Sequence, residues 1–221
     1  MTQYHNQKDY WESVAFDKTF TTHFQIDLFS RHVPVEAVIL DVGCGYGRTL
    51  EALYQRGYRS LQGVDFSMNM TQRAASLYPH LNIRHHEKSA LPFPDDSIDA
   101  ALLLAVLTCM ADDSGQERLI SEIERVLKPT GRLYVNDFLL NDDERNKQRY
   151  EAFKDAYGVY GVFELPEGAV LRHFEVSRIE RLLSNFHPIA FEKTTYKTMN
   201  GHQSNGFYFL GEKLIQRRPL A

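Results

Sequence analysis

The chain has 221 residues, of which 43% are hydrophobic and 24% charged, and its formal net charge is -4 at pH 7. This composition is typical of a globular protein with a sizeable core, and the slightly acidic balance disfavours nucleic acid as the main partner. Its two cysteines, Cys44 and Cys109, have neither CxxC nor zinc spacing, so we expect no disulfide framework, no metal site and a reducing cytoplasmic setting. The N-terminus has no signal-peptide pattern, and the longest apolar run, residues 100–107, is too short to cross a membrane.

The first two thirds of the chain alternate between strand and helix patterns. Residues 114–117, Ser-Gly-Gln-Glu, match a capping box and predict the start of a helix that ends at Pro129 and Gly131. Alternation of this kind predicts right-handed crossovers and a parallel sheet covered by helices. In chain order we expect strands at 38–42, 61–65, 81–85, 98–104 and 133–138, and helices at 48–56, 67–77 and after residue 114.

The C-terminal third has a different pattern. Residues 141–144, Asn-Asp-Asp-Glu, predict the start of a helix that Gly158 ends. Residues 157–173 are rich in glycine and aromatic residues and are predicted to form a long ordered loop, with a short helix at 179–186. Strand-like runs at 189–196 and 207–210 flank the polar turn 200–206 and predict an antiparallel pair.

Residues 38–47 are the most informative stretch, because an apolar run ends at Asp41 and glycines follow at positions 43, 45 and 47. Such a turn permits positive φ and lets a ligand approach the bare backbone, and the next helix offers free N–H groups. The pattern predicts a nucleotide-like cofactor. The dinucleotide fingerprint needs glycine at its sixth position, where this chain has Arg48. A carboxylate at Asp41 suits the ammonium group of an amino acid and would repel a pyrophosphate.

Asp65 ends the second predicted strand, in the sequence Gly-Val-Asp-Phe-Ser of residues 63–67. A carboxylate at this place can accept hydrogen bonds from both hydroxyls of a ribose. Alternatively, it helps to begin the helix whose predicted N-cap is Ser67. Together with the glycine turn, Asp65 favours ribose binding.

Four motifs resemble, in order and spacing, those of class I S-adenosylmethionine-dependent methyltransferases of the small-molecule, methyltransferase-11/25-like type. They are residues 41–47 (Asp-Val-Gly-Cys-Gly-Tyr-Gly), 63–65 (Gly-Val-Asp), 90–93 (Ala-Leu-Pro-Phe) with the acidic stretch 95–99, and 127–131 (Leu-Lys-Pro-Thr-Gly). The resemblance implies S-adenosyl-L-methionine as cofactor and S-adenosyl-L-homocysteine as product. It also implies a doubly wound, three-layer α/β/α fold with a mostly parallel seven-stranded sheet whose last strand is antiparallel.

The resemblance further implies a single Rossmann-like domain over residues 1–221. Residues 1–34 would form an N-terminal helical cap, and residues 141–186 a substrate-side insertion between strands five and six. Asp41 would hold the ammonium group of the cofactor and Asp65 its ribose. The remaining cofactor-binding residues would be Gly43, Cys44 and Gly45 at the methionine part, Ser89 and Ala90 beside the adenine, Phe66 and Leu91 on its two faces, and Leu104 and Ala105 beneath the sulfonium.

Candidates for the acceptor site are aromatic and basic. Tyr10 and Trp11 are expected to close over the cofactor, and His23 to lie near the acceptor. His173 is the candidate catalytic residue, as a general base if the acceptor arrives protonated. With its neighbour Arg172 it would form two adjacent cations, which suit an anionic acceptor such as a carboxylate.

The predicted activity is therefore in-line transfer of a methyl group to an O, N or S atom of a small molecule. Alternatives are an NAD-binding oxidoreductase, a non-catalytic S-adenosylmethionine-binding module, and a methyltransferase acting on RNA or protein. Residues 105–109, Ala-Val-Leu-Thr-Cys, lack the Asn-Pro-Pro-Tyr-like tetrad of enzymes that methylate planar amines. The chain also shows no appended basic domain, so we expect no nucleic acid and no membrane as partner.

Overall fold

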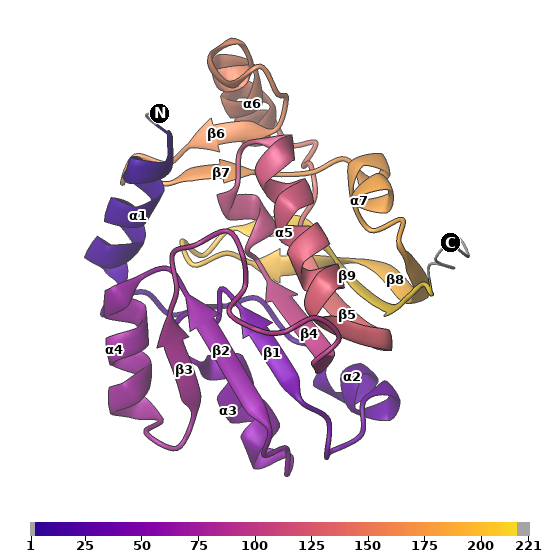
Figure 1. Ribbon diagram of the computed structural model, residues 1–221. Helices are drawn as coiled ribbons and strands as arrows, with labels where there is room; N and C mark the ends of the chain where they lie inside the picture. The colour runs from indigo at the N-terminus through magenta and orange to yellow at the C-terminus, as the bar shows by residue number, and fades with distance from the viewer. Residues whose placement is uncertain (1–2, 216–221) are drawn as a thin grey trace.

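The structure is a computed structural model that describes residues 3–215, with a central sheet between two helical layers (Figure 1). The predicted domain (1–221) and cap (1–34) also include residues that lie outside this described part. The main sheet is built from β1 (Ile39–Val42), β2 (Leu61–Asp65), β3 (Asn82–His85), β4 (Ile98–Leu104), β5 (Leu127–Phe138), β8 (Phe186–Lys197) and β9 (Gln203–Lys213). A separate two-stranded sheet consists of β6 (Val162–Glu164) and β7 (Val170–Arg172).

The helices follow the predicted alternation in the first part of the chain. They are α1 (Gln3–Val14), α2 (Ile26–His32), α3 (Arg48–Gln55), α4 (Met68–Leu77), the 3-10 helix η1 (Leu107–Cys109), α5 (Asp113–Val126), α6 (Glu144–Tyr157) and α7 (Val176–Leu182). Helix α4 begins at the predicted N-cap, because the Ser67 side chain accepts a hydrogen bond from the Met70 N–H. Gly158 ends α6 in a left-handed conformation, with φ of 66°.

The seven strands of the main sheet lie in the order β3-β2-β1-β4-β5-β9-β8. Strands β1 to β5 pair in parallel, β9 pairs antiparallel with β5, and β8 pairs antiparallel with β9. The predicted mostly parallel seven-stranded sheet with an antiparallel last strand is confirmed. The reversal follows from the chain: β8 and β9 are joined by a short polar turn, and such turns join antiparallel strands.

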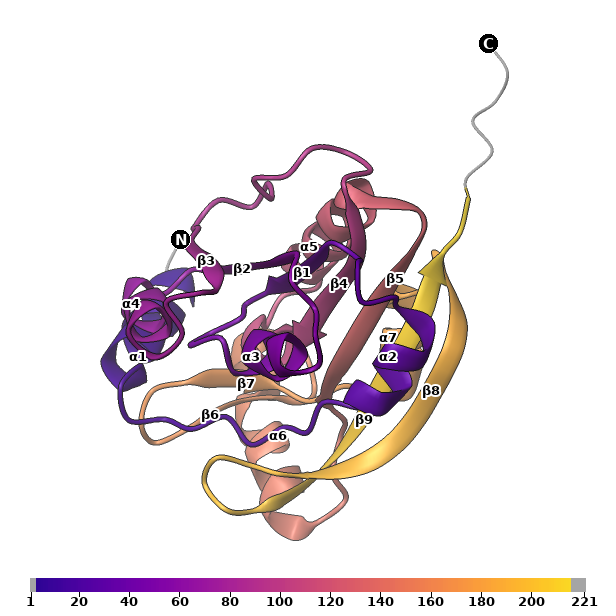
Figure 2. The same cartoon turned by 90° about the horizontal axis from the view of Figure 1, so that it is seen from below.

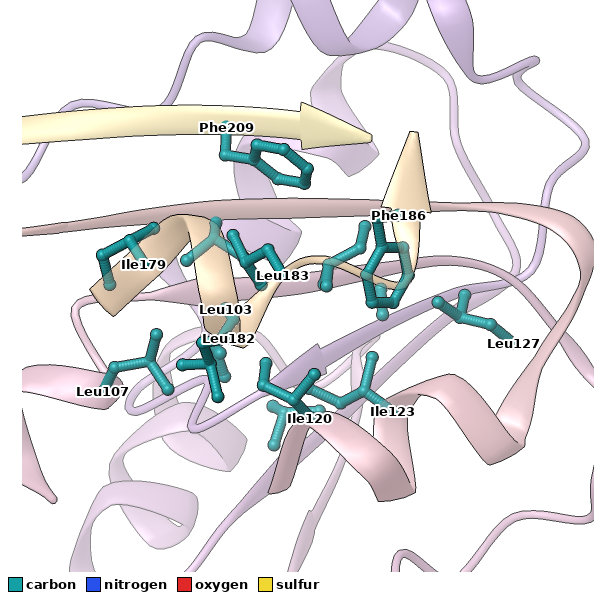
Figure 3. Packing of buried hydrophobic residues seen from close by; sticks show 14 of the residues in the cluster. Leu103, Leu107, Ile120, Ile123, Leu127, Ile179, Leu182, Leu183, Phe186 and Phe209 are labelled. Atoms are coloured by element: carbon teal, nitrogen blue, oxygen red, sulfur yellow. The ribbon is translucent and has the colours of Figure 1, made fainter. Parts of the chain in front are cut away.

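Strand β4 shows how the sheet serves two hydrophobic cores, because successive strand residues point to opposite faces. Ala101 and Leu103 pack with α5 and α7 on one face, and the close view of this core shows Leu103 beside Ile120, Leu182 and Leu183 (Figure 3). Ala100 and Leu102 pack with α2 and α3 on the other face. Figure 2 shows the two helical layers on either side of the sheet. The predicted three-layer arrangement is thus confirmed.

Three local predictions need correction. The predicted capping box at residues 114–117 does not begin α5, since Asp112 is the N-cap and accepts from the Gly115 N–H at 2.6 Å. The stretch 157–173 is not only a loop but contains the β6–β7 hairpin. Strands β5, β8 and β9 are longer than predicted, because pairing with neighbouring strands extends them beyond their apolar residues.

The carboxyl ends of β1, β2 and β4 point toward the β6–β7 hairpin and α6 (Figure 1). In open parallel sheets ligands bind outside these ends, where the strand order reverses. Here that place lies between β1 and β4. Within residues 3–215, no helix is both long and apolar enough to cross a membrane.

Truncation of Ile123 tests the packing of α5 on the sheet, because this side chain is fully buried among α5, α7 and β4 (Figure 3). We expect Ile123→Ala to lower the free energy of unfolding by about 2–5 kcal/mol in urea titrations. Leu119→Ala on the same helix is the matched control, since Leu119 is only partly buried. Equal losses in both variants would contradict this packing.

Candidate functional site

The glycine turn after β1 is tied to the end of β2 by backbone hydrogen bonds. The N–H groups of Gly43 and Cys44 both donate to the Val64 carbonyl, at 2.8 and 3.1 Å. Gly45 has a φ of 53°, and its N–H donates to Asp65 Oδ2 at 2.7 Å. A Cβ atom at Gly45 would lie 2.2 Å from Phe20 Cε2, so glycine is required both by the backbone and by the packed ring. The turn therefore brings the ends of β1 and β2 together.

Asp41 is a buried carboxylate whose oxygens accept no hydrogen bond from any residue within 3–215. Its side chain lines a cavity although the residue is only 2% exposed. Burial raises its pKa to about 8, and the charge of Asp65 adds to the rise while Arg48 opposes it. A buried carboxylate without a partner is destabilising, so a cationic group placed beside Asp41 would relieve this cost.

Asp65 performs one of the two tasks that the sequence left open, since it helps to begin α4. Its Oδ1 accepts from the Ser67 N–H at 2.9 Å at the start of α4, and its Oδ2 accepts from Gly45. Burial raises its pKa to about 6, although both backbone hydrogen bonds favour the ionised form. Each carboxylate oxygen retains a second lone pair, and the side chain lines the same cavity as Asp41. Asp65 can therefore also accept hydrogen bonds from hydroxyls.

Arg48, the first residue of α3, lies next to this pair of acids. One guanidinium nitrogen donates to the Thr22 carbonyl at 2.7 Å, while Nε is buried without a hydrogen-bond partner among the described residues. Arg48 lines the cavity, and its charge opposes the rise in the pKa of Asp41. A carboxylate and a guanidinium on one wall complement the two charges of an amino-acid zwitterion.

The cavity has a volume of about 540 Å³, within the range of small-molecule sites. It extends from the glycine turn to the β6–β7 hairpin and the turn between β8 and β9. Beyond the residues already described, its walls include Met70, Leu104, Ala105, Val106, Phe138, Phe163, Leu165, Leu171, Thr198, Met199, His202 and Ser204.

The end of β4 turns sharply at Ala105. This residue has a φ of 54°, which is uncommon for a residue with a Cβ atom, and its N–H donates to the Asn136 carbonyl at 2.8 Å. The turn leaves Leu104, Ala105 and Val106 all on the cavity wall. Strained backbone of this kind persists where the surrounding structure holds it, commonly at functional sites.

The N-terminal segment covers part of the cavity, and both views show α1 beside α4 (Figures 1 and 2). Glu12 accepts from the Met68 and Asn69 N–H groups at the start of α4, at 2.7 and 2.9 Å. A carboxylate there also complements the helix dipole. Arg73 of α4 donates to the carbonyls of Ala15 and Lys18, both at 2.7 Å. These bonds hold Tyr10 and Trp11, which line the cavity.

His173, the residue after β7, lies in a buried polar network at the cavity wall. Its Nδ1 is 2.6 Å from the Tyr150 hydroxyl and 3.2 Å from Asn141 Nδ2. Since Asn141 Oδ1 accepts from the Asn205 N–H at 2.8 Å, Nδ2 of Asn141 is the donor. Burial, together with the charges of Arg149 and Arg145, lowers the pKa of His173 to about 3. The ring is therefore neutral, with its proton on Nε2.

This network corrects the expected pair of cations at Arg172 and His173. Arg172 does not line the cavity: its guanidinium donates to Asp113 Oδ1 at 2.6 Å and to the Ala111 carbonyl at 2.9 Å. His173 lines the cavity but is neutral, and its protonated Nε2 is a donor rather than a base. Sequence neighbours on β7 and just after it point to different sides, as strand geometry requires.

Most of the other predicted site residues lie together at the cavity. Its lining includes Tyr10, Trp11, Asp41, Gly43, Cys44, Asp65, Phe66, Leu104, Ala105 and His173. The remaining ones do not line it. Gly45 is covered by Phe20, Ser89, Ala90 and His23 are exposed, and Leu91 is buried in the core. An adenine role for residues 89–91 stays a prediction.

Several residues that line the cavity were not predicted from the sequence. Arg48 was considered only as a departure from the dinucleotide fingerprint, although its place directly after the last glycine signals a position beside the ligand. Phe138, at the end of β5, has the same kind of signal, because strand ends meet at the site. Arg145 and Arg149 are four residues apart on α6, so they share one face. No signal in the sequence shows that this face meets the cavity.

Comparisons with known proteins agree with this geometry. A family model described as a methyltransferase domain matches residues 40–135, which contain the glycine turn, Asp65 and the end of β4. A crystal structure of a SAM-dependent methyltransferase from Methanosarcina mazei has a TM-score of 0.80 and 28% sequence identity, covering 88% of this chain and 99% of that one.

The names of two curated relatives state different methyl acceptors. The 2-phytyl-1,4-naphtoquinone methyltransferase of Nostoc sp. is 35% identical over 126 residues, which cover 53% of this chain and 52% of that protein. The eEF1A lysine and N-terminal methyltransferase of Mus musculus is 26% identical over 142 residues, which cover 56% of this chain and 20% of that protein. The chain thus spans about half the length of the first and a fifth of the second.

Replacing Asp41 tests the unsatisfied carboxylate directly. Its pKa is about 8 in the folded protein and 3.8 in the reference state. Between these pH values the folded state binds a proton that the unfolded state has released, so the free energy of unfolding falls as pH rises from one value to the other. Asp41→Asn removes this titration. We expect the ligand-free variant to exceed the original protein in stability by about 1–3 kcal/mol at pH 8, with a smaller difference at pH 5.

Thermal unfolding at both pH values is the measurement. Asp99→Asn is the control, for which the expected change in melting temperature has the opposite sign. The Lys128 ammonium group and the Val38 N–H hold the pKa of Asp99 below its usual value despite its partial burial, so its removal should lower the melting temperature at pH 8. A lower melting temperature for Asp41→Asn at pH 8 would refute the interpretation that the unpaired Asp41 carboxylate destabilises the ligand-free protein.

Proposed function

Because this chain belongs to the class I S-adenosylmethionine-dependent methyltransferases, we propose that it transfers a methyl group from S-adenosylmethionine to a small-molecule acceptor in its cavity. The single observation that carries the proposal is the convergence of Asp41, Arg48 and Asp65 on one wall of that cavity. Family membership removes the NAD-dependent oxidoreductase alternative.

The residues at the glycine turn fit the cofactor of the family. Asp41 has free carboxylate oxygens for the ammonium group, and Arg48 has a buried Nε without a partner for the carboxylate. Asp65 offers lone pairs to the ribose hydroxyls while it holds the Gly45 N–H. When bound, S-adenosylmethionine supplies a methyl group on an activated sulfonium.

The protein's own contribution is alignment and exclusion of water. The turn at Ala105 presents Leu104 to Val106 as a wall, and Tyr10 and Trp11 cover the cavity from the N-terminal side. Holding two reactants in a fixed geometry supplies much of the rate of such a displacement. His173 is neutral and donates from Nε2, so it orients an acceptor rather than removing its proton. Cys109 is not a nucleophile, since burial raises the pKa of its thiol.

The acceptor class is the finer part of the proposal. The cavity volume is suited to a small molecule, and its walls include both the N-terminal segment and the β6–β7 hairpin. Residues 1–34 then act as a cap, and residues 141–186 as the acceptor-side insertion. The mouse relative is named for protein acceptors, so a protein substrate is the competing outcome.

Titration calorimetry tests cofactor binding. S-adenosylhomocysteine and S-adenosylmethionine should bind about 100-fold or more tightly than NAD. A difference of this size is expected when the amino-acid end of the ligand pairs its two charges with Asp41 and Arg48. Because binding of the ammonium group needs ionised Asp41, affinity should rise from pH 6 to pH 8 by up to about tenfold per unit, with proton release. Asp41→Asn should bind weakly at every pH. Tighter binding of NAD would overturn the cofactor assignment.

Fractionated cell extract distinguishes the acceptor classes. The protein is incubated with methyl-labelled S-adenosylmethionine and either the low-mass filtrate or the desalted macromolecular fraction. We expect label only in products of the filtrate, and none with Asp65→Ala, which removes the carboxylate that we propose binds the ribose. Label in protein or RNA would show a macromolecular acceptor. No label in either fraction, with the cofactor bound, would identify a non-catalytic binding module.

A further inference from the structure

A half-buried arginine, Arg149, with no ion-pair partner among the described residues lies at the α6 side of the cavity. Arg149 lines the cavity, and its guanidinium carbon lies 3.5 Å from the centre of the Phe163 ring and 5.7 Å from that of Tyr150. Its Nε is buried without a hydrogen-bond partner, and no carboxylate within residues 3–215 lies in ion-pair distance of it. Partial burial lowers the pKa of Arg149, because burial disfavours its charged form.

The acids near Arg149 are already used elsewhere. Asp143, whose charge faces both Arg145 and Arg149, begins α6 by accepting from the Asn146 N–H at 3.2 Å and from the Asn146 side chain. Glu164 accepts from the Tyr157 hydroxyl at 2.7 Å. Glu167 accepts from Asn200 Nδ2 at 3.0 Å and lies 3.6 Å from the Lys18 ammonium group. The protein therefore leaves the charge of Arg149 to be balanced from within the cavity.

Two further groups at this place suit an anion. Arg145 lines the cavity one helical turn before Arg149 and places a second positive charge on the same face of α6, with its Nε 3.9 Å from Asp143 Oδ1. Arg149 and His173 both contact the Phe163 ring, at 3.5 and 4.9 Å from its centre, so the two side chains are close. The Nε2 proton of His173 has no acceptor among the described residues and adds a neutral donor.

The surrounding walls are apolar. Phe163 meets the His173 ring edge-on, with ring centres 4.9 Å apart, and Phe138 stacks on the other side at 5.5 Å and 26°. Leu165 and Leu171 complete this part of the lining. A ligand here needs an apolar or aromatic body with one negative end. Arginine binds both carboxylates and phosphates through its planar fork of N–H groups.

We propose that Arg149, assisted by Arg145 and His173, binds the oxyanion of an organic acceptor, a carboxylate or a phosphate, and so sets the acceptor specificity of this site. The inference rests on the proposed function, because it names the acceptor class of the same cavity. The sequence indicated Arg172 as the residue that binds an anion. The inference assigns this role instead to Arg149 of α6, two elements earlier in the chain.

Simple aromatic probes test the inference without knowledge of the natural acceptor. Benzoate, phenyl phosphate and the neutral benzamide are titrated by calorimetry, with and without saturating S-adenosylhomocysteine. The only tryptophan, Trp11, lines the cavity, so its fluorescence gives a second readout. We expect one of the two anions to bind about tenfold or more tightly than benzamide, as one charge-assisted pair allows, and the favoured anion distinguishes carboxylate from phosphate.

Variants on α6 assign the selectivity to Arg149. Arg149→Leu should bind both anions no better than benzamide. Arg149→Lys should regain part of the preference, because lysine restores the charge but not the fork. Lys147→Leu is the matched control: it removes the same charge from an exposed position of the same helix outside the cavity, and should leave selectivity unchanged.

The outcomes separate this inference from the proposed function. Normal binding of S-adenosylhomocysteine with equal or absent binding of all three probes would overturn the anion site alone. Anion selectivity that persists in a folded Arg149→Leu protein would also overturn it. Loss of S-adenosylhomocysteine binding in the unmodified protein would instead refute the cofactor assignment, and Arg149-dependent anion binding would still be measurable without it.

Discussion

Two buried carboxylates at the ends of adjacent parallel strands are the constraint on which the site depends. Asp41 and Asp65 are each less than a tenth exposed, and burial raises the pKa of both. Like charges in such a place destabilise the ligand-free protein. The glycine turn makes the arrangement possible, because its N–H groups bind the end of β2 and leave Asp41 facing the cavity. Natural proteins commonly accept a loss of stability at a functional site.

The cavity has a charged group of different character at each end. At the glycine turn, Asp41 and Arg48 together match a zwitterion, and at α6 Arg149 has no carboxylate partner among the described residues. Between them lie Leu104, Phe138 and other apolar side chains. A low-polarity wall strengthens each electrostatic contact, since little water screens it. The same environment makes an unpaired, partly buried charge unfavourable, which is why Arg149 is informative about the ligand.

Much of the site was predictable because it depends on local sequence. Asp41, the glycines and Asp65 are consecutive with strands whose apolar runs are visible, and parallel strands bring their carboxyl ends to one edge. Arg172 and His173 show the limit of this reasoning. They are neighbours in sequence, yet one pairs with Asp113 and the other faces the cavity. The start of α5 at Asp112 rather than Ser114 is a smaller error of the same kind, between two adjacent capping candidates.

The alternation of strands and helices, the glycine turn with its two acids and the family resemblance could be predicted, because they follow from periodicity and from residues close in the chain. Which side chains meet across elements depends on the folded chain. The tertiary structure placed Arg149 of α6 on Phe163 of β6, and Tyr150 and Asn141 on Nδ1 of His173, which leaves the ring proton on Nε2. Burial and the partners of each charge are properties of the folded surroundings, and they decide whether a histidine is a base or a donor and whether an arginine is free to bind a ligand.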